Sequence, residues 1–383
     1  MQRRQLFSLT SALGLSFAMG GVAKANVATA SIVPSAQTPL LLNFNENALG
    51  ISPKAKVAVA QVLDKASRYA DAYLARLCAK LEKLYGLTTG QVAVSAGSSV
   101  ILQAAIYDQW AKAQKQGKAF QIVAPDPTYG LFADTAKAIG VSYVAVPLLK
   151  NTMGYDWATL KEKVRAFDGV SLVYLCNPNN PTGLVESKRH LNAWIEWAAK
   201  NQPNAFFVVD EAYAEYVTNP AFATAIRLVQ KGYKNLMVAR TFSKLYGLAG
   251  LRVGYGMADA KVLADIQACT TYIDCNLTGA VAAITTLDDA TYLNQSLRMT
   301  KQSRAIVQAT LKELGWKFVA SEANFIFHEA PIADYAAKLK AQHIIVGRAF
   351  APFDGWNRLT LGTPEEMKVW AKAVLALAKK EVK

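Results

Sequence analysis

The chain has 383 residues, of which 52% are hydrophobic and 18% charged, and its formal net charge is +14 at pH 7. This composition is typical of a globular protein and excludes an intrinsically disordered chain, and the length suggests two domains. The lysines are spread along amphipathic stretches rather than clustered with aromatic residues, so the charge favours a solvated surface over a nucleic-acid-binding face.

The first 25 residues have the three regions of a secretory signal peptide. Arg3 and Arg4 precede an uncharged run over residues 6–23, and Ala23-Lys24-Ala25 offers a small-x-small cleavage site. The adjacent arginines resemble a twin-arginine export signal, which carries proteins already folded and often loaded with a cofactor. No later run is as apolar as a membrane span of roughly eighteen residues requires. We therefore expect a periplasmic protein without a membrane span; the alternative is an uncleaved basic start on a cytoplasmic protein.

The next segments lead into a helical pattern. Residues 26–39 are rich in Ser, Thr, Ala and Pro and are predicted to form a flexible connection. Residues 40–47 are extended and end in a turn-rich run, after which Pro53 opens a helical pattern that continues through Leu63.

From about residue 90, short apolar runs of β type alternate with longer helical segments such as 187–200. Strands are expected at 91–94, 120–123, 141–146, 171–175, 206–209, 236–239 and 253–257. These runs are nearly continuous in apolar residues, which is typical of strands covered by helices on both faces. The pattern predicts an α/β fold with a mostly parallel sheet.

The pattern changes beyond about residue 285. A long helical stretch at 292–314 leads into short β-type runs at 324–328, 344–346 and 358–361 and a closing helix from Pro364. We expect a smaller α+β domain formed by residues 285–383 together with 40–60, beside a large domain of residues 61–284.

Ligands of open α/β sheets bind beyond the carboxyl ends of the strands, and polar turns follow the predicted strands here. The run 95–99 contains Gly97, Ser98 and Ser99 between a strand and a helix, so it can cradle a phosphate; the alternative is an ordinary helix cap. The run 176–183 holds two prolines and a glycine, which form a rigid turn able to aim Asn180 at a ligand.

Two further turns complete the set. Asp210-Glu211-Ala212-Tyr213 directly follows an apolar strand, so Asp210 is either a helix cap or a buried partner of a cation. The stretch 241–255 carries Lys244 and Arg252 in a turn rich in hydroxyls and glycine. An anion cradle, a carboxylate, hydrogen-bond partners and a lysine nucleophile are together what pyridoxal phosphate requires of a protein.

These motifs resemble one enzyme family. Thr-Phe-Ser-Lys-Leu-Tyr-Gly-Leu-Ala-Gly-Leu-Arg-Val-Gly, Asn-Pro-Asn-Asn-Pro-Thr-Gly and Asp-Glu-Ala-Tyr look like the class I/II aminotransferases of pyridoxal-phosphate fold type I, closest to their histidinol-phosphate aminotransferase-like branch. The resemblance covers residues 43 to about 363. It implies a large domain with a seven-stranded type of sheet, transfer of an amino group from an amino acid or a phosphorylated amino alcohol to a 2-oxo acid, and a homodimer with shared active sites.

The resemblance also implies roles for individual residues. Lys244 matches the lysine that binds the cofactor aldehyde and moves the substrate Cα proton, and Asp210 matches the partner of the pyridinium nitrogen. The remaining cofactor contacts are implied at Asn180 and Tyr213 (3-oxygen), Tyr129 (ring stacking), Ser98, Ser99, Thr241, Ser243 and Arg252 (phosphate), and Tyr69 (the phosphate of the neighbouring subunit). Arg358 matches the arginine that holds the substrate carboxylate.

Substrate choice is less constrained. Ala70 replaces the usual proline of a Tyr-Pro-Asp run, Val100 stands where the branch has an acidic residue, and Gly347-Arg348 is shifted from the usual Val-Arg pair, which puts histidinol phosphate in doubt. Arg348 is either a second anion contact or a solvated residue. The turn at Asn45 is the third candidate for substrate binding.

Several alternatives and absences accompany this interpretation. A lyase or decarboxylase could use the same scaffold, because fold does not determine reaction type. A dinucleotide-binding glycine pattern at Gly247, Gly250 and Gly254 and a non-catalytic binding protein are weaker alternatives. The three histidines are far apart and the four cysteines form no C-x-x-C pair, so we expect no metal site, with a Cys269–Cys275 disulfide left open.

Overall fold

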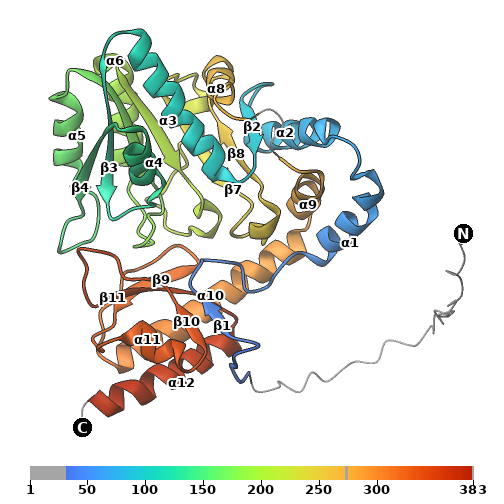
Figure 1. The fold of residues 1–383 in the computed structure, drawn as a ribbon, viewed down its shortest axis with the longest axis vertical. Coiled ribbons are helices and arrows are strands. Elements are labelled where there is room, and N and C mark those ends of the chain that lie inside the picture. Colours follow the sequence, from blue (N-terminus) through green and yellow to red (C-terminus); the bar gives the residue numbers. More distant parts are fainter. Residues whose placement is uncertain (1–31, 272–274, 382–383) are drawn as a thin grey trace, which may run out of the picture. The chain divides into compact units, whose positions relative to one another are not determined.

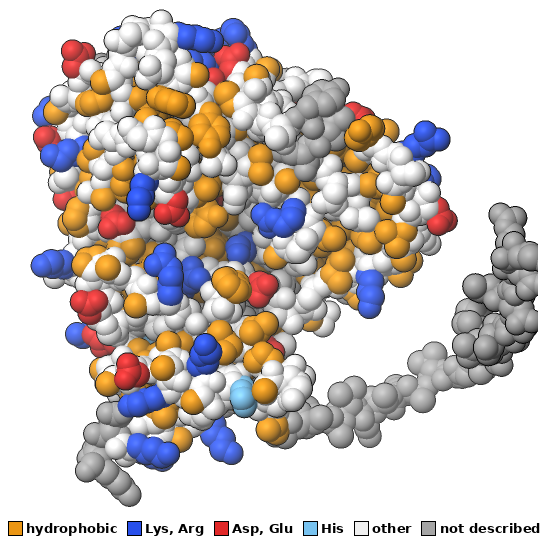
Figure 2. Space-filling view, in the orientation of Figure 1, with side chains coloured by type: hydrophobic (Ala, Val, Ile, Leu, Met, Phe, Trp, Pro, Cys, Tyr) orange, Lys and Arg blue, Asp and Glu red, His pale blue; other side chains and the backbone are white. Residues whose placement is uncertain are grey.

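The computed structural model describes residues 32–271 and 275–381, so the predicted signal peptide lies outside the described residues. Residues 33–383 cluster into one compact unit, and the division into two domains stays a prediction. Within the described ranges no helix is long and apolar enough to cross a membrane. In the space-filling view, basic side chains are scattered over the visible face rather than gathered in one patch (Figure 2).

A seven-stranded sheet forms the centre of the fold and confirms the predicted α/β class. Its strands lie in the order β2 (Val92–Ser95), β8 (Gly254–Met257), β7 (Leu236–Thr241), β6 (Ala205–Asp210), β5 (Gly169–Cys176), β3 (Ala119–Asp126) and β4 (Ser142–Pro147). The pairs are parallel except that β8 is antiparallel to both β2 and β7. Each predicted strand overlaps an observed one.

Helices cover both faces of this sheet. Successive residues of a strand point to opposite faces, and because both sets are apolar, both faces have to be buried. One face packs against α3 (Ser98–Lys115), α4 (Leu131–Ile139) and α8 (Ala260–Gln267); the other packs against α2 (Asp71–Tyr85), α5 (Trp157–Arg165), α6 (Lys188–Asn201), α7 (Ile226–Gln230) and α9 (Leu277–Leu287). Along β5, for example, Leu172 and Tyr174 face the first group while Val173 and Leu175 face the second. Figure 1 shows α3 lying across the sheet.

The C-terminal part has a second hydrophobic core. It contains α10 (Ala290–Glu313), β9 (Phe325–Glu329), α11 (Tyr335–Lys340), β10 (Ile344–Val346), β11 (Trp356–Thr360) and α12 (Pro364–Glu381). β9 and β11 pair antiparallel, and β1 (Leu40–Leu42), from the start of the described chain, pairs in parallel with β10 (Figure 1). The N-terminal strand therefore belongs to the same layer as the C-terminal strands.

Residues 43–52, here called the crossing segment, connect β1 to α1 (Pro53–Val62). α1 begins where the hydroxyl of Ser52 accepts a hydrogen bond from the backbone N–H of Ala55, with Pro53 at the first helical position. The crossing segment is held at its middle by Asn47, whose amide donates to the carbonyl of Leu245 (2.7 Å) and to the hydroxyl of Ser296 (2.8 Å). The segment thus passes beside the turn that carries Lys244.

Candidate active site

A cavity of about 790 Å³ lies beside the carboxyl ends of β3, β5, β6 and β7. Its volume is in the range typical of small-molecule sites. Of the site residues predicted from the sequence, all but Tyr69 line it: Asn45, Ser98, Ser99, Tyr129, Asn180, Asp210, Tyr213, Thr241, Ser243, Lys244, Arg252, Arg348 and Arg358. Residues separated by more than 300 positions are therefore brought to one hollow, although their individual roles stay predictions.

Lys244 extends from the turn after β7. Its Nζ donates a hydrogen bond to the carbonyl oxygen of Phe44 in the crossing segment (3.2 Å) and lies 5.8 Å from the centre of the Tyr213 ring. Burial and the nearby positive charge of Arg358 lower the pKa of Lys244 to about 8. A lysine with such a pKa has a sizeable neutral fraction near neutral pH, which nucleophilic attack on a carbonyl requires.

Asp210 ends β6 and is buried. The Tyr174 hydroxyl donates to its Oδ2 (2.9 Å) and the backbone N–H of Ala212 donates to its Oδ1 (3.1 Å). Burial nevertheless raises the pKa of Asp210 to about 6, although these hydrogen bonds and Lys244 favour its charged form. A buried carboxyl of this kind is stabilised as a carboxylate when a cationic ring nitrogen lies against it.

An anion site lies where α3 begins. Ser98 and Ser99 occupy the first turn of α3, and a Cβ at Gly97 would collide with the guanidinium of Arg252, so glycine lets that cation lie against the helix N-terminus. Arg252 donates to the hydroxyl of Ser243 (3.5 Å) and forms no ion pair within residues 32–271 and 275–381. A helix N-terminus, hydroxyls and an uncompensated guanidinium together suit a phosphate group.

Aromatic and amide side chains line the cavity next to this anion site. The hydroxyls of Tyr129 and Ser99 are hydrogen-bonded (3.1 Å), which links the predicted stacking residue to the phosphate site. The Tyr213 hydroxyl accepts from Nδ2 of Asn45 (3.1 Å). Asn45 is buried and has a positive φ of 55°, a strained conformation that its hydrogen bonds with Thr360 help to maintain.

Arg358 reaches into the cavity from β11. Its Nη1 donates to Oδ1 of Asn180 (2.6 Å) and its Nη2 donates to the carbonyl of Asn43 (2.8 Å), while its buried Nε has no hydrogen-bond partner. Burial lowers the pKa of Arg358 from its usual value. This buried guanidinium has no carboxylate partner in the described parts of the chain, as expected of a group that receives an anionic ligand.

Arg348 lies on the outer wall of the cavity. Its guanidinium lies 4.3 Å from the centre of the Phe350 ring, and its Nη1 donates to the carbonyl of Ala349 (3.3 Å). Arg358 lies 5.3 Å from the same ring, so Phe350 is close to both arginines. A Cβ at Gly347 would collide with the carbonyl of Arg358, which explains why glycine occupies that position.

Tyr69 does not reach this cavity. Its side chain is 83% exposed in the turn before α2. This position is compatible with a role outside its own subunit, but it gives Tyr69 no contact in its own site.

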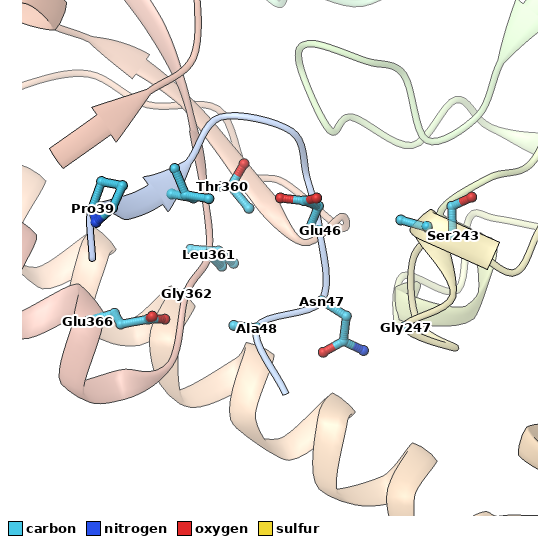
Figure 3. Close-up of a pocket in the computed structure, with 13 residues that line it drawn as sticks. Pro39, Glu46, Asn47, Ala48, Ser243, Gly247, Thr360, Leu361, Gly362 and Glu366 are labelled. Atoms are coloured by element: carbon cyan, nitrogen blue, oxygen red, sulfur yellow. The ribbon is translucent and has the colours of Figure 1, made fainter. Parts of the chain in front are cut away.

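A second hollow of about 400 Å³ lies against the crossing segment (Figure 3). Glu46, Asn47 and Ser243 line it together with Thr360 and Glu366. Glu46, Ser243 and Ala249 line both hollows, so the two hollows are neighbours. Because Lys244, Asp210 and Arg358 line only the larger cavity, that cavity is the candidate active site.

Sequence reasoning missed four groups. Tyr174 donates to Asp210 from β5, Phe350 lies close to both arginines, and the carbonyls of Asn43 and Phe44 accept from Arg358 and Lys244, respectively. Tyr174 could have been found from the sequence. It lies two residues before the end of its strand and pairs with Val208, which lies two residues before Asp210 in the next strand. The backbone carbonyls could not have been found in this way. The Cys269–Cys275 disulfide is not formed, since Cys269 is a free thiol.

The chain matches the family model described as aminotransferase class I and II over residues 37–374, and it belongs to that family. It is 33% identical over 341 residues to the histidinol-phosphate aminotransferase of Symbiobacterium thermophilum, covering 88% of this chain and 89% of that protein. A crystal structure from Erwinia carotovora atroseptica SCRI1043, provisionally named a histidinol-phosphate aminotransferase, is 35% identical with a TM-score of 0.87 and covers 92% of this chain and 99% of that one. The Sinorhizobium meliloti enzyme, determined with pyridoxal-5'-phosphate, shares the fold at 24% identity and a TM-score of 0.77, with 89% and 91% covered.

The family match confirms a pyridoxal-phosphate-dependent aminotransferase of the histidinol-phosphate aminotransferase-like branch. The lyase or decarboxylase alternative is not favoured. The residues present fit the cofactor: an uncompensated guanidinium at a helix N-terminus for the phosphate, a buried carboxyl for the ring nitrogen and a lysine of lowered pKa for the aldehyde.

Proposed function

We propose that the chain moves the amino group of an α-amino acid, held through its carboxylate by Arg358, to a 2-oxo acid, and that it does so as a periplasmic homodimer. The observation that supports this most is that one cavity is lined by a lysine of lowered pKa, by the buried carboxyl of Asp210 and by the guanidinium of Arg358, which forms no ion pair within the described residues.

Each group has a distinct task. When bound, pyridoxal phosphate supplies an aldehyde that amines attack and a ring that withdraws electrons from the substrate Cα. The neutral amine of Lys244 would hold that aldehyde, and the same amine is placed to accept the proton of the substrate Cα. Asp210 would hold the ring nitrogen in its protonated form, and Ser98, Ser99, Ser243 and Arg252 would hold the phosphate.

Arg358 supports an α-amino acid. Its Nη1 and Nη2 form a planar fork that matches the two oxygens of a carboxylate, which would replace the carbonyl of Asn43 as acceptor. A phosphorylated amino alcohol is the second candidate, because the relatives named above are called histidinol-phosphate aminotransferases. A phosphate in the same place would also require cations beyond Arg358, and Arg348 is stacked on Phe350 instead.

The dimer proposal concerns Tyr69. The resemblance assigns this position to the phosphate of the neighbouring subunit, and the exposed side chain is free to extend from its own chain. Light scattering should give twice the chain mass. Tyr69→Phe should weaken cofactor binding without changing that mass, whereas a monomer with full cofactor affinity would contradict the proposal.

The periplasmic proposal rests on the paired arginines at positions 3 and 4. Cell fractionation should find the mature protein in the periplasm, and Arg3→Lys together with Arg4→Lys should leave it in the cytoplasm. Equal distribution of both forms would refute export through this signal.

The catalytic proposal is tested by trapping and by half-reactions. Borohydride should attach the cofactor irreversibly to the wild-type chain at Lys244 and not to Lys244→Ala. Single amino acids and histidinol phosphate should then be compared for their ability to consume the visible band of the lysine-bound cofactor. A chain that reacts with histidinol phosphate and with no amino acid would make the second candidate correct.

A further inference from the structure

Phe44 is fixed by its backbone directly between the two groups that act on the substrate. Its own carbonyl accepts from Lys244 (3.2 Å), and the carbonyl of the preceding Asn43 accepts from Arg358 (2.8 Å). The next residue, Asn45, is held through its N–H by Thr360 (2.9 Å) and through its amide by Tyr213 (3.1 Å). The main chain at residue 44 is therefore held on both sides.

The side chain of Phe44 has the opposite character. Phe44 is one of the residues that line the cavity and is 68% exposed, and its ring makes no aromatic or cation–π contact with any residue in the described ranges. An exposed aromatic ring on a rigid backbone at a cavity mouth gains free energy when an apolar ligand group covers it.

The lining of this cavity also includes apolar side chains. Leu131 at the start of α4, Ala336 of α11, Val346 of β10 and Phe350 line the same hollow. These side chains come from three separate parts of the chain. They offer a substrate side chain apolar contacts in addition to Phe44.

The side chain of a bound substrate has to share the cavity with these apolar residues. Lys244 acts at Cα and Arg358 holds the carboxylate, and the two donors reach the carbonyls of consecutive residues. A substrate whose carboxylate binds Arg358 and whose Cα faces Lys244 would therefore lie beside residue 44, with its side chain in the same cavity. We propose that Phe44 determines specificity and that the amino substrate carries a large apolar or aromatic side chain. This inference rests on the proposed function and names the substrate class for that site.

The charged groups of the outer wall do not favour an acidic side chain. Arg348 is stacked on Phe350 and donates to a backbone carbonyl. Asp134 of α4 lines the same cavity and forms no ion pair with a described residue, and its carboxylate has the charge that repels an anionic side chain. What remains for recognition is apolar contact.

The test is a set of half-reactions of the loaded enzyme with phenylalanine, leucine, alanine and aspartate. We expect kcat/KM for phenylalanine to exceed that for aspartate at least tenfold. Phe44→Ala should lower the ratio of phenylalanine to alanine about tenfold, the usual scale for a lost apolar contact in a specificity pocket. Phe44→Leu should restore most of the ratio.

Leu41→Ala is the matched control. Leu41 is also apolar and exposed (55%), lies three residues earlier and does not line the active-site cavity, so its replacement should leave the ratio unchanged. A second measurement does not depend on turnover. Binding of 3-phenylpropanoate, followed by calorimetry, should be tighter than that of propanoate in the wild type and not in Phe44→Ala.

The outcomes separate the two proposals. A preference for aspartate that Phe44→Ala does not change would overturn the apolar subsite while leaving the aminotransferase intact. Equal loss for all donors in Phe44→Ala, with a changed oligomeric mass, would also overturn it, because the ring would then serve assembly. Absence of any half-reaction in a cofactor-loaded wild type would count against the proposed function, whereas discrimination between 3-phenylpropanoate and propanoate would still report on Phe44.

Discussion

Lys244 and Arg358 donate hydrogen bonds to the carbonyl oxygens of consecutive residues, Phe44 at 3.2 Å and Asn43 at 2.8 Å. The crossing segment thereby links the amine that binds the cofactor to the guanidinium that receives the substrate carboxylate. The link is also electrostatic. Burial is the largest cause of the lowered pKa of Lys244, and the positive charge of Arg358 is the second largest. A substrate carboxylate on Arg358 would weaken that contribution and make Lys244 more basic when it has to take a proton.

The first prediction concerns the titration of Lys244. The rate at which cofactor-free enzyme captures pyridoxal phosphate should rise with pH and level off above about pH 8, because only the neutral amine attacks the aldehyde. Arg358→Gln removes a positive charge and should raise the pKa of Lys244, which moves the midpoint to higher pH. Stopped-flow absorbance over a pH series measures both curves. Arg348→Gln is the control with no expected shift, and a midpoint that stays in place in Arg358→Gln would contradict the coupling.

The second prediction concerns Asp210. Its pKa of about 6 lies above the roughly 3.9 of an unfolded aspartate, so its contribution to the stability of the cofactor-free protein is complete below pH 4 and is lost as the pH rises through 6. A protonated ring nitrogen favours the ionised carboxylate, and cofactor affinity should therefore increase as the pH rises through about 6.

Asp210→Asn supplies the comparison, because asparagine retains the shape of the side chain and cannot ionise. Its cofactor affinity should be lower than that of the wild type at pH 7.5 and should lack the step near pH 6. Equilibrium titrations with pyridoxal phosphate at several pH values give this directly. The same step in both proteins would assign it to another group.

The fold and most of the cavity lining could be predicted because they depend on local features. Alternating apolar runs and helical segments define a parallel sheet, and the carboxyl ends of parallel strands meet at one edge, which brings Asp210 and Lys244 together. The crossing segment could not be placed in this way. Phe44 and Lys244 are 200 positions apart, and their contact uses a backbone carbonyl that every residue type possesses. The pairing of β1 with β10 and the hydrogen bonds of Asn45 with Thr360 and of Asn47 with Leu245 bring them together.

The orientation of the Arg348 side chain could not be predicted from the sequence either. Its position in the sequence predicted either an anion contact or a solvated residue, and its residue type is compatible with both. Its guanidinium lies 4.3 Å from the centre of the Phe350 ring, and its Nη1 donates to the carbonyl of Ala349. Both contacts depend on how the loop after β10 folds, and a motif contains no information about that.

The third prediction concerns the phosphate site. Gly97 has a positive φ of 78°, and a Cβ there would collide with the guanidinium of Arg252, so Gly97→Ala should displace that cation and weaken cofactor binding at least tenfold. Gly250→Ala is the matched control, because a Cβ at Gly250 meets no atom within 4 Å and the residue belongs to the same lysine motif. Cofactor dissociation constants of the two variants should differ. Equal values would mean that Arg252 does not hold the phosphate.

The fourth prediction concerns a buried ion pair next to the catalytic residues. Arg240, which precedes Thr241, donates through Nη2 (2.7 Å) and Nε (3.1 Å) to Glu211, which follows Asp210. The two side chains are 9% and 1% exposed, and Nη1 of Arg240 also donates to Glu215 (3.3 Å). This cluster joins the ends of β6 and β7, where the carboxyl of Asp210 and the turn of Lys244 begin.

Arg240→Met leaves two buried carboxylates without their cation, so the free energy of unfolding of the cofactor-free protein should fall by about 3–5 kcal/mol. Lys80→Met is the contrasting control: it removes an ion pair with Asp288 of similar length (2.6 Å), but those side chains are 31% and 67% exposed, and the loss should stay within about 1 kcal/mol. Urea unfolding followed by circular dichroism measures both. Losses of equal size would show that burial does not set the strength of the Arg240 cluster, and the alignment of Asp210 with Lys244 would then have to depend on the sheet alone.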